Sequence, residues 1–284
     1  MASSIDNEYH DLMSSGKKLY KSKKYSDSIK FFKKAIKVDE KRPASFLWLA
    51  KSLIKLRKFD ESLYYNDILL TVSPNHHTGW LQRINLFTYM YNFSEVVICC
   101  DKAFKISKFE SSFAQISEYK INALLKLNKI LDAKKIVKES LKKFPNNVNI
   151  LAVSASVFER LEEFDLAVSL YTSAIKIQPN NWKFWYNRGI NLLHLNNNKS
   201  RINFKKATIL NPKNEKCWLM LGSVSLSDLH YAIECFDKSI AINSKYVRAY
   251  ENKGRALEFL GRLDESRQCY ALAMDISGRN DDFV

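Results

Sequence analysis

Apolar residues recur along this chain at helical spacing, and short polar turns interrupt them. Four segments share one order of residues: an aromatic or Leu, an acidic residue, a small residue, an aromatic four residues on in three of the four, and usually a small residue three beyond. These segments are KKYSDSIKFFKKAIKVD, RKFDESLYYNDILLTVSP, EEFDLAVSLYTSAIKIQP and GRLDESRQCYALAMDIS. The spacing i, i+4, i+7 places the last three positions on one face of an α-helix. The pattern therefore predicts a chain built from amphipathic helices.

Proline and glycine recur at a similar interval. Four prolines, separated by 71, 34 and 33 residues, are Pro74, Pro145, Pro179 and Pro212. With Trp182 as position 1, each of these prolines lies three residues before the start of a repeat, and four glycines share position 8 of their repeats: Gly16, Gly189, Gly222 and Gly254. The spacing predicts eight repeats, each of two helices and a tight turn. Their predicted bounds are 9–42, 43–76, 77–110, 114–147, 148–181, 182–214, 215–246 and 247–280.

The first helix of each repeat is expected to bury positions 4, 7, 8 and 11, which cluster on one side at about 100° per residue. In the sixth repeat these are Trp185, Arg188, Gly189 and Leu192. A helical glycine costs about 1 kcal/mol relative to alanine, so its recurrence indicates a close approach of the second helix. Small residues are expected to meet it there: Ala35, Ala167, Ala174 and Ala232. Trp80, Trp185 and Trp218 share position 4 and are predicted to lie in the core.

These features resemble the tetratricopeptide repeat, a helix-turn-helix unit of 34 residues. The resemblance covers residues 9–280 and implies one all-α domain over 1–284, a right-handed α-α solenoid whose first helices line a concave face. The third repeat departs from the pattern at Ile84 and Val96, and the fourth follows three extra residues and lacks an aromatic at Ile130. The sixth and seventh repeats are shorter in the turn, around LNNNKS and SLSDLH, which leaves their register open.

The net charge of +15, with a pI near 9.4, favours an acidic partner or a polyanion. Five scattered cysteines, without metal-ligand spacing, predict neither a metal site nor a disulfide framework. Phosphate-binding glycine loops and the HExxH and GxSxG motifs are missing, so we expect no enzyme and no cofactor. The acidic start MASSIDNEYHD and the lack of a long apolar run predict a cytoplasmic protein that does not enter membranes.

Positions 2, 6, 9 and 13 of each first helix lie opposite the predicted buried stripe and are free to touch a ligand. Basic and polar residues occupy positions 9 and 13 of the first four repeats: Lys17, Lys21, Lys51, Lys55, Asn85, Tyr89, Asn122 and Lys126. A second cluster lies toward the C-terminus: Lys183, Asn187, Lys216, Arg248, Asn252 and Arg255. Asparagine can hold a peptide backbone and cations hold carboxylates, so both clusters are candidate ligand grooves.

The resemblance implies a non-enzymatic scaffold or adaptor, and the basic residues favour an extended acidic segment of another protein as its ligand. The clamp with which some relatives hold chaperone tails is not supported, because Ile190 and Met220 replace its Asn and Arg. RNA or another polyanion is an alternative partner, as is self-association through the last repeat, which no capping helix follows. In a lysine-rich chain, solvated helix faces would also carry such charges.

Overall fold

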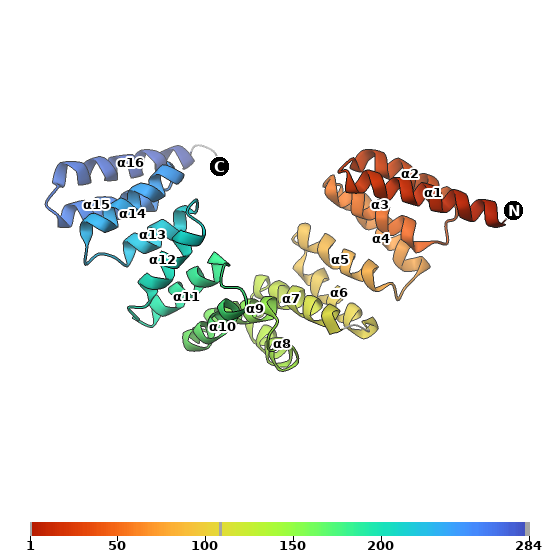
Figure 1. Ribbon diagram of the computed structural model, residues 1–284, viewed down its shortest axis with the longest axis horizontal. Coiled ribbons are helices and arrows are strands. Elements are labelled where there is room, and N and C mark those ends of the chain that lie inside the picture. Colours follow the sequence, from red (N-terminus) through yellow and green to blue (C-terminus); the bar gives the residue numbers. More distant parts are fainter. Residues whose placement is uncertain (1, 108–109, 282–284) are drawn as a thin grey trace. The chain divides into compact units, whose positions relative to one another are not determined.

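The computed structural model describes residues 2–107 and 110–281, and within them the chain forms sixteen α-helices and no strand (Figure 1). The N-terminal segment, Met1–Phe144, is one compact group of helices, and the C-terminal segment, Pro145–Val284, is another. The N-terminal segment holds α1 (Ala2–Lys21), α2 (Tyr25–Val38), α3 (Pro43–Lys55), α4 (Phe59–Val72), α5 (His77–Tyr89), α6 (Phe93–Ile106), α7 (Glu110–Lys126) and α8 (Ile130–Lys143). The C-terminal segment holds α9 (Val148–Arg160), α10 (Phe164–Ile177), α11 (Trp182–His194), α12 (Ser200–Leu210), α13 (Glu215–Ser223), α14 (Leu229–Ile242), α15 (Val247–Phe259) and α16 (Leu263–Asp281).

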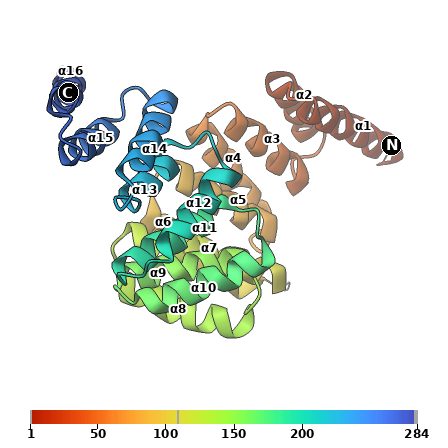
Figure 2. The ribbon, with the colours of Figure 1, turned by 60° about the vertical axis from the view of Figure 1, so that its left-hand side comes forward.

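Within each segment every helix packs against the helix that follows it (Figure 1, Figure 2). First helices of neighbouring repeats also touch: α1 contacts α3, α3 contacts α5, α5 contacts α7, and α13 contacts α15. This is the architecture of a helical solenoid, in which stacked helix pairs bury a continuous core. It confirms the predicted all-α solenoid, while the joining of the two segments into one domain remains a prediction.

Six of the eight first helices begin at the predicted start of their repeat: α3, α5, α9, α11, α13 and α15. The other two begin earlier, α1 at Ala2 instead of residue 9 and α7 at Glu110 instead of residue 114. The longer α7 takes up the three extra residues that precede the fourth repeat. The third repeat was predicted to end at residue 110, and residues 108 and 109 of that prediction lie outside the described residues.

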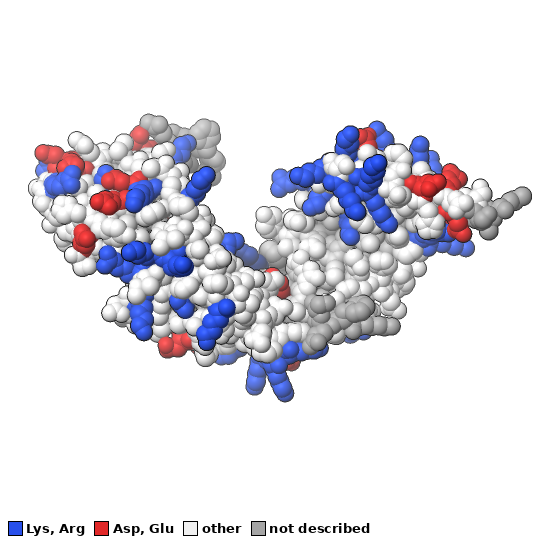
Figure 3. Space-filling view, viewed as in Figure 1, with Lys and Arg blue, Asp and Glu red and all other residues white. Residues whose placement is uncertain are grey.

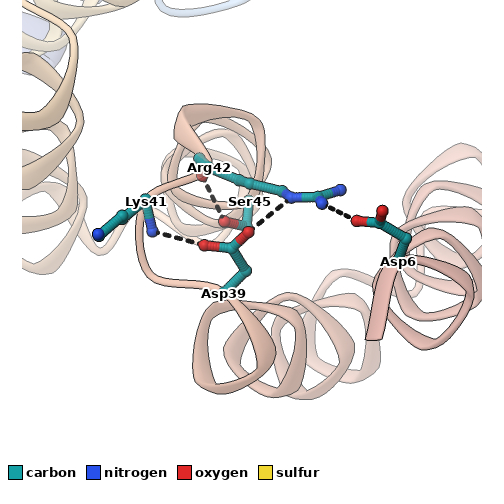
Figure 4. A network of polar contacts seen from close by, with 5 residues as sticks. All are labelled: Asp6, Asp39, Lys41, Arg42 and Ser45. Carbon is teal, nitrogen blue, oxygen red and sulfur yellow. Dashed lines mark hydrogen bonds and ion pairs between the residues drawn. The ribbon is translucent and has the colours of Figure 1, made fainter. Parts of the chain in front are cut away.

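The early start of α1 has a polar network beside it (Figure 4). Arg42, which precedes α3, donates from Nε to Asp39 Oδ2 at 2.7 Å and pairs through its other end with Asp6 of α1. The backbone N–H of Lys41 donates to Asp39 Oδ1 at 3.0 Å, and Ser45 Oγ donates to the Arg42 carbonyl at 2.8 Å. The Lys41 N–H and the Arg42 guanidinium hold the pKa of Asp39 below its ordinary value. The network thus ties α1 to the turn between the first two repeats.

A recurring proline lies in the turns between repeats. Its carbonyl accepts the indole N–H of the tryptophan six residues on, at 2.8 Å from Trp80 to Pro74, 2.8 Å from Trp185 to Pro179 and 2.9 Å from Trp218 to Pro212. Asparagines two residues after three of the prolines cap the next helix by accepting its backbone N–H groups: Asn147, Asn181 and Asn214. Such caps satisfy N–H groups that have no partner inside the helix.

The turns inside the repeats share one backbone conformation. The fifteenth residue of seven repeats has a positive φ: Lys23, Arg57, Tyr91, Asn128, Glu162, Asn196 and Gly261. This left-handed region ends a helix and favours glycine, which has no β-carbon to clash with the backbone. The seventh repeat has no such residue within 223–229, which the structure describes.

We expect Gly261→Ala to lower the free energy of unfolding by about 1 kcal/mol, because alanine is strained at a φ of 75°. A β-carbon at this position would meet no atom within 4 Å, so backbone strain is the only cost. Urea denaturation followed by circular dichroism measures the change. Gly278→Ala, in open space within α16, is the control and is expected not to destabilise. Equal midpoints for wild type and Gly261→Ala would show that the turn carries no strain.

The glycines at position 8 allow an aromatic ring of the second helix to lie against the first. A β-carbon would lie 2.5 Å from Phe32 at Gly16, 2.8 Å from Phe204 at Gly189, 2.5 Å from Phe236 at Gly222 and 3.0 Å from Tyr270 at Gly254. The prediction that alanines meet these glycines is wrong, because the nearest atoms belong to the rings. Ala35, Ala167, Ala174 and Ala232 are fully buried elsewhere in the packing.

The shorter sixth and seventh repeats leave this contact in place. Phe204 follows Gly189 by 15 residues and Phe236 follows Gly222 by 14, whereas Phe32 follows Gly16 by 16. The missing residues come out of the helices, because α12 has 11 residues where α10 has 14, and α13 has 9 where α9 has 13. The loops 195–199 and 224–228 are longer than the corresponding loop 161–163, so the prediction of shorter turns is wrong, while the contact between glycine and ring is kept.

The buried face of the first helix is wider than predicted. In the sixth repeat Gly189 and Leu192 are buried as expected, and so are Phe184 and Asn191 at positions 3 and 10. Arg188 at position 7 is only half-buried, and so are the three tryptophans at position 4. The reason is that a first helix packs against its own second helix and against neighbouring repeats. The tryptophans lie at the edge of the core, where their N–H groups reach the prolyl carbonyls.

Candidate ligand-binding surface

Two adjoining hollows lie on the first helices of the N-terminal segment. The smaller hollow, about 390 Å³, is bounded by residues of α1, α3, α5 and α7: Tyr20, Trp48, Lys51, Ile54, Lys55, Thr78, Leu81, Gln82, Asn85, Tyr89 and Gln115. The larger hollow, about 590 Å³, is bounded by α3 to α7 and their turns: Ile54, Lys55, Arg57, Phe59, Thr88, Tyr89, Tyr91, Phe93, Val96, Tyr119, Asn122, Ala123 and Lys126. The hollows share Ile54, Lys55 and Tyr89, so they form one continuous surface.

The walls of these hollows carry cations and no carboxylate. Lys51, Lys55, Arg57 and Lys126 line them, and Asp and Glu are missing from the lining residues. None of the four forms an ion pair with an acidic residue in the described parts of the chain. Figure 3 shows Lys and Arg gathered over α1 to α4, with acidic side chains toward the N-terminal end. The surface is therefore electrostatically prepared for an anionic ligand.

Two lysines are held over one tryptophan in the smaller hollow. The Nζ atom of Lys51 lies 4.8 Å from the centre of the Trp48 ring, and that of Lys17 lies 5.6 Å from it. A ring face attracts a cation, so Trp48 positions both ammonium groups without neutralising them. Burial lowers the pKa of Lys51, because removal from water disfavours the charged form. A carboxylate that binds beside Lys51 would stabilise its charged form in place of the lost water.

Polar side chains of the fifth and seventh helices complete the surface. The Tyr119 hydroxyl donates to Asn85 Oδ1 at 2.5 Å, and Asn85 Nδ2 donates to the Leu81 carbonyl at 3.1 Å. Asn85 is thus fixed by the protein itself. Asn122, one repeat further on, is exposed on the wall of the larger hollow and offers both a donor and an acceptor.

Six of the predicted N-terminal site residues line these hollows: Lys51, Lys55, Asn85, Tyr89, Asn122 and Lys126. Lys17 lines neither hollow but lies over the ring of Trp48, which lines the smaller one. Lys21 is exposed at the end of α1 and lines neither hollow. Sequence reasoning missed the aromatic walls. Part of the signal was present at position 6, where the second and fourth repeats carry Trp48 and Tyr119.

The predicted C-terminal cluster is more open and partly engaged. Lys183, Lys216, Arg248 and Arg255 are exposed side chains. Asn187 donates to the Tyr171 hydroxyl at 3.2 Å and Asn252 donates to Ser223 Oγ at 3.1 Å.

A half-buried carboxylate lies close to this cluster. Asn191 donates to Glu159 Oε1 at 2.6 Å, and burial raises the pKa of Glu159. Tyr171 contacts both Asn187 and Glu159, so the C-terminal cluster has an acidic neighbour that the two hollows lack. The described lining of the two N-terminal hollows, by contrast, contains no Asp or Glu.

Stacked helix pairs of this kind define a helical repeat protein. Sequence models of the tetratricopeptide repeat family match residues 120–181 and 247–280. These two stretches of the chain are tetratricopeptide repeats. Proteins of this family bind other proteins and generally serve as non-catalytic scaffolds.

Solved structures share the fold. A tetratricopeptide repeat protein from Parabacteroides merdae is 12% identical with a TM-score of 0.66, covering 94% of this chain and 99% of that one. The structure of MamA is 21% identical with a TM-score of 0.55, covering 57% of this chain and 97% of that one. An uncharacterized protein of Methanocaldococcus jannaschii is 44% identical over 43 residues, which are 15% of this chain and half of that relative.

Within residues 2–107 and 110–281, no helix is long and apolar enough to cross a bilayer. The same residues contain no group of three or more His, Cys, Asp and Glu side chains that could hold a metal ion. All five cysteines are buried, and burial raises the pKa of the Cys217 thiol to about 12 and that of Cys99 to about 11. These thiols act as packing groups and not as nucleophiles.

Proposed function

We propose that this protein is a non-enzymatic adaptor whose two N-terminal hollows bind an extended acidic segment of another protein. The observation that carries the proposal is the lining: four cations, several amides and hydroxyls, and no carboxylate. Cations near a preformed surface attract carboxylates, and amide side chains pair with a peptide backbone. A preformed surface also avoids part of the ordering cost of binding.

The direction of the groove supports an extended ligand. The smaller hollow draws residues from four successive first helices, so a chain lying along it would pass from one repeat to the next. Lys51 and Lys55 lie on one face of α3 at a spacing of four residues, and Lys126 lies two repeats further on. A ligand with several carboxylates along its length would meet each cation in turn.

A salt titration tests the proposal against RNA. We expect the full chain to bind a fluorescein-labelled acidic peptide more tightly than a single-stranded RNA of similar charge, as measured by anisotropy. The peptide should lose affinity only moderately between 50 and 200 mM salt, whereas a ligand held by many phosphate contacts would lose about a thousandfold or more. Tighter RNA binding with the steeper slope would replace the adaptor proposal with a polyanion-binding one. Binding of neither probe would contradict both.

A further inference from the structure

Aromatic rings form much of the wall of the larger hollow. Phe59 and Tyr89 stack with ring centres 5.7 Å apart and an interplanar angle of 10°. Tyr91 and Phe93 meet edge to face, 6.2 Å apart at 86°. Tyr119 completes the wall from α7. Lysines alone would suffice to hold an acidic chain, so these rings indicate a second element of recognition.

Two of these rings are exposed in a way that folding does not require. Tyr89 is 52% exposed and Tyr91 is 80% exposed. Tyr91 also occupies the left-handed turn position, where the other repeats have Lys, Arg, Asn, Glu or Gly. A large ring there gains almost nothing from burial and is sterically disfavoured relative to glycine or asparagine. Exposed aromatic side chains beside a hollow are typical of binding surfaces.

We infer that the larger hollow receives an aromatic side chain of the acidic segment, a conclusion that rests on the proposed function above. The hollow of about 590 Å³ falls within the 300 to 1,000 Å³ range of ligand pockets and has room for a ring. Aromatic rings attract one another in stacked and edge-to-face arrangements, and this wall offers both. Lys55, Arg57 and Lys126 also line this hollow and can hold carboxylates that flank the ring. The ligand motif is an aromatic residue between acidic residues.

A peptide pair separates this inference from the proposed function. Two labelled peptides carry the same acidic residues and differ only at one central position, Trp or Ala. We expect the wild-type chain to bind the Trp peptide about tenfold more tightly than the Ala peptide, because burial of part of the indole ring contributes that much binding free energy. Isothermal titration and anisotropy on the full chain give the two dissociation constants.

Variants of the wall locate the ring. The double variant Tyr89→Ala with Tyr91→Asn is expected to reduce the preference for Trp from about tenfold to less than threefold. Asparagine is chosen because Asn128 and Asn196 occupy the same turn position in other repeats. Tyr64→Ala removes a tyrosine on α4 whose exposure of 61% lies between those of Tyr89 and Tyr91 and which lines neither hollow, and we expect the preference to remain about tenfold.

The outcomes distinguish two failures. A third peptide, in which neutral residues replace the acidic ones, serves as the reference. Equal binding of the Trp and Ala peptides, with weaker binding of the neutral peptide, would overturn the aromatic subsite and leave the acidic-segment proposal standing. A preference for Trp that survives the double variant would place the ring elsewhere and also overturn the inference. If neither peptide binds more tightly than the neutral one, the proposed function falls and the subsite falls with it.

Discussion

Replacing Gly222 with isoleucine is expected to lower the free energy of unfolding by about 3 kcal/mol, at the upper end of the usual cost of overpacking. The cause is the ring of Phe236, whose Cε1 atom would lie 2.5 Å from the new β-carbon. Phe236 is fully buried and cannot swing away without opening the core. Urea denaturation of the full chain, followed by circular dichroism, measures the loss.

The third repeat contains the compensating partner. Ile84 occupies position 8 there, and the residue at the place of the ring is Cys100; both are fully buried in one core cluster. We therefore expect Phe236→Cys alone to cost about 3 kcal/mol by leaving a cavity. The double variant Gly222→Ile with Phe236→Cys should recover about 2 kcal/mol relative to the sum of the single changes, since residues in contact couple.

Gly278→Ile is the control for the same substitution in open space, because no atom lies within 4 Å of a β-carbon at Gly278. It should leave the midpoint of unfolding almost unchanged. Additive single effects in the double variant would contradict the idea that glycine and ring sizes are matched across repeats.

Reversing the charge of Lys51 and Lys55 is expected to weaken binding of an acidic peptide by about a hundredfold, or about 3 kcal/mol. Both lysines line the hollows, and glutamates there would repel the carboxylates that the lysines hold. Anisotropy with the labelled peptide measures the affinity. Thermal unfolding by circular dichroism should show a folded protein, because Lys55 is exposed and Lys51 is half-buried at the surface.

A matched control removes the effect of net charge. Lys138→Glu with Lys142→Glu changes two exposed lysines at the same spacing of four residues on α8, and neither lines the hollows. We expect less than a threefold change from this pair. Equal losses from both pairs would mean that the peptide responds to the overall charge of the protein and not to this surface.

The sequence predicted where most first helices begin, but it predicted the contacts and burial of individual side chains less well. Proline spacing and amphipathic periodicity predicted six helix starts, since both depend on local backbone preferences that repeat along the chain. The identity of the group that meets Gly222 could not be read in the same way, because it depends on how far the second helix rotates about its axis. The half-buried state of Trp185 likewise follows from its hydrogen bond to Pro179, a contact that helical periodicity does not represent.

The candidate site was likewise predicted only in part from the sequence. Positions 9 and 13 predicted the three lysines that line the two hollows, because side chains at these positions lie on the same face of a first helix. The aromatic walls were missed because Phe59, Tyr91 and Phe93 come from turns and the starts of second helices. Such residues have no fixed place on the face of a first helix, and only the folded chain brings them beside Tyr119.

The hydrogen bonds from Trp80, Trp185 and Trp218 to prolyl carbonyls make these tryptophans intrinsic fluorescent probes of the turns between repeats. Each indole senses one junction between adjacent repeats, and its emission shifts when that junction opens and water replaces the carbonyl. A set of variants that each retain one of these three tryptophans, with phenylalanine at Trp48 and Trp182, would report three junctions separately. The order in which the three signals change in urea would trace how unfolding spreads along the solenoid.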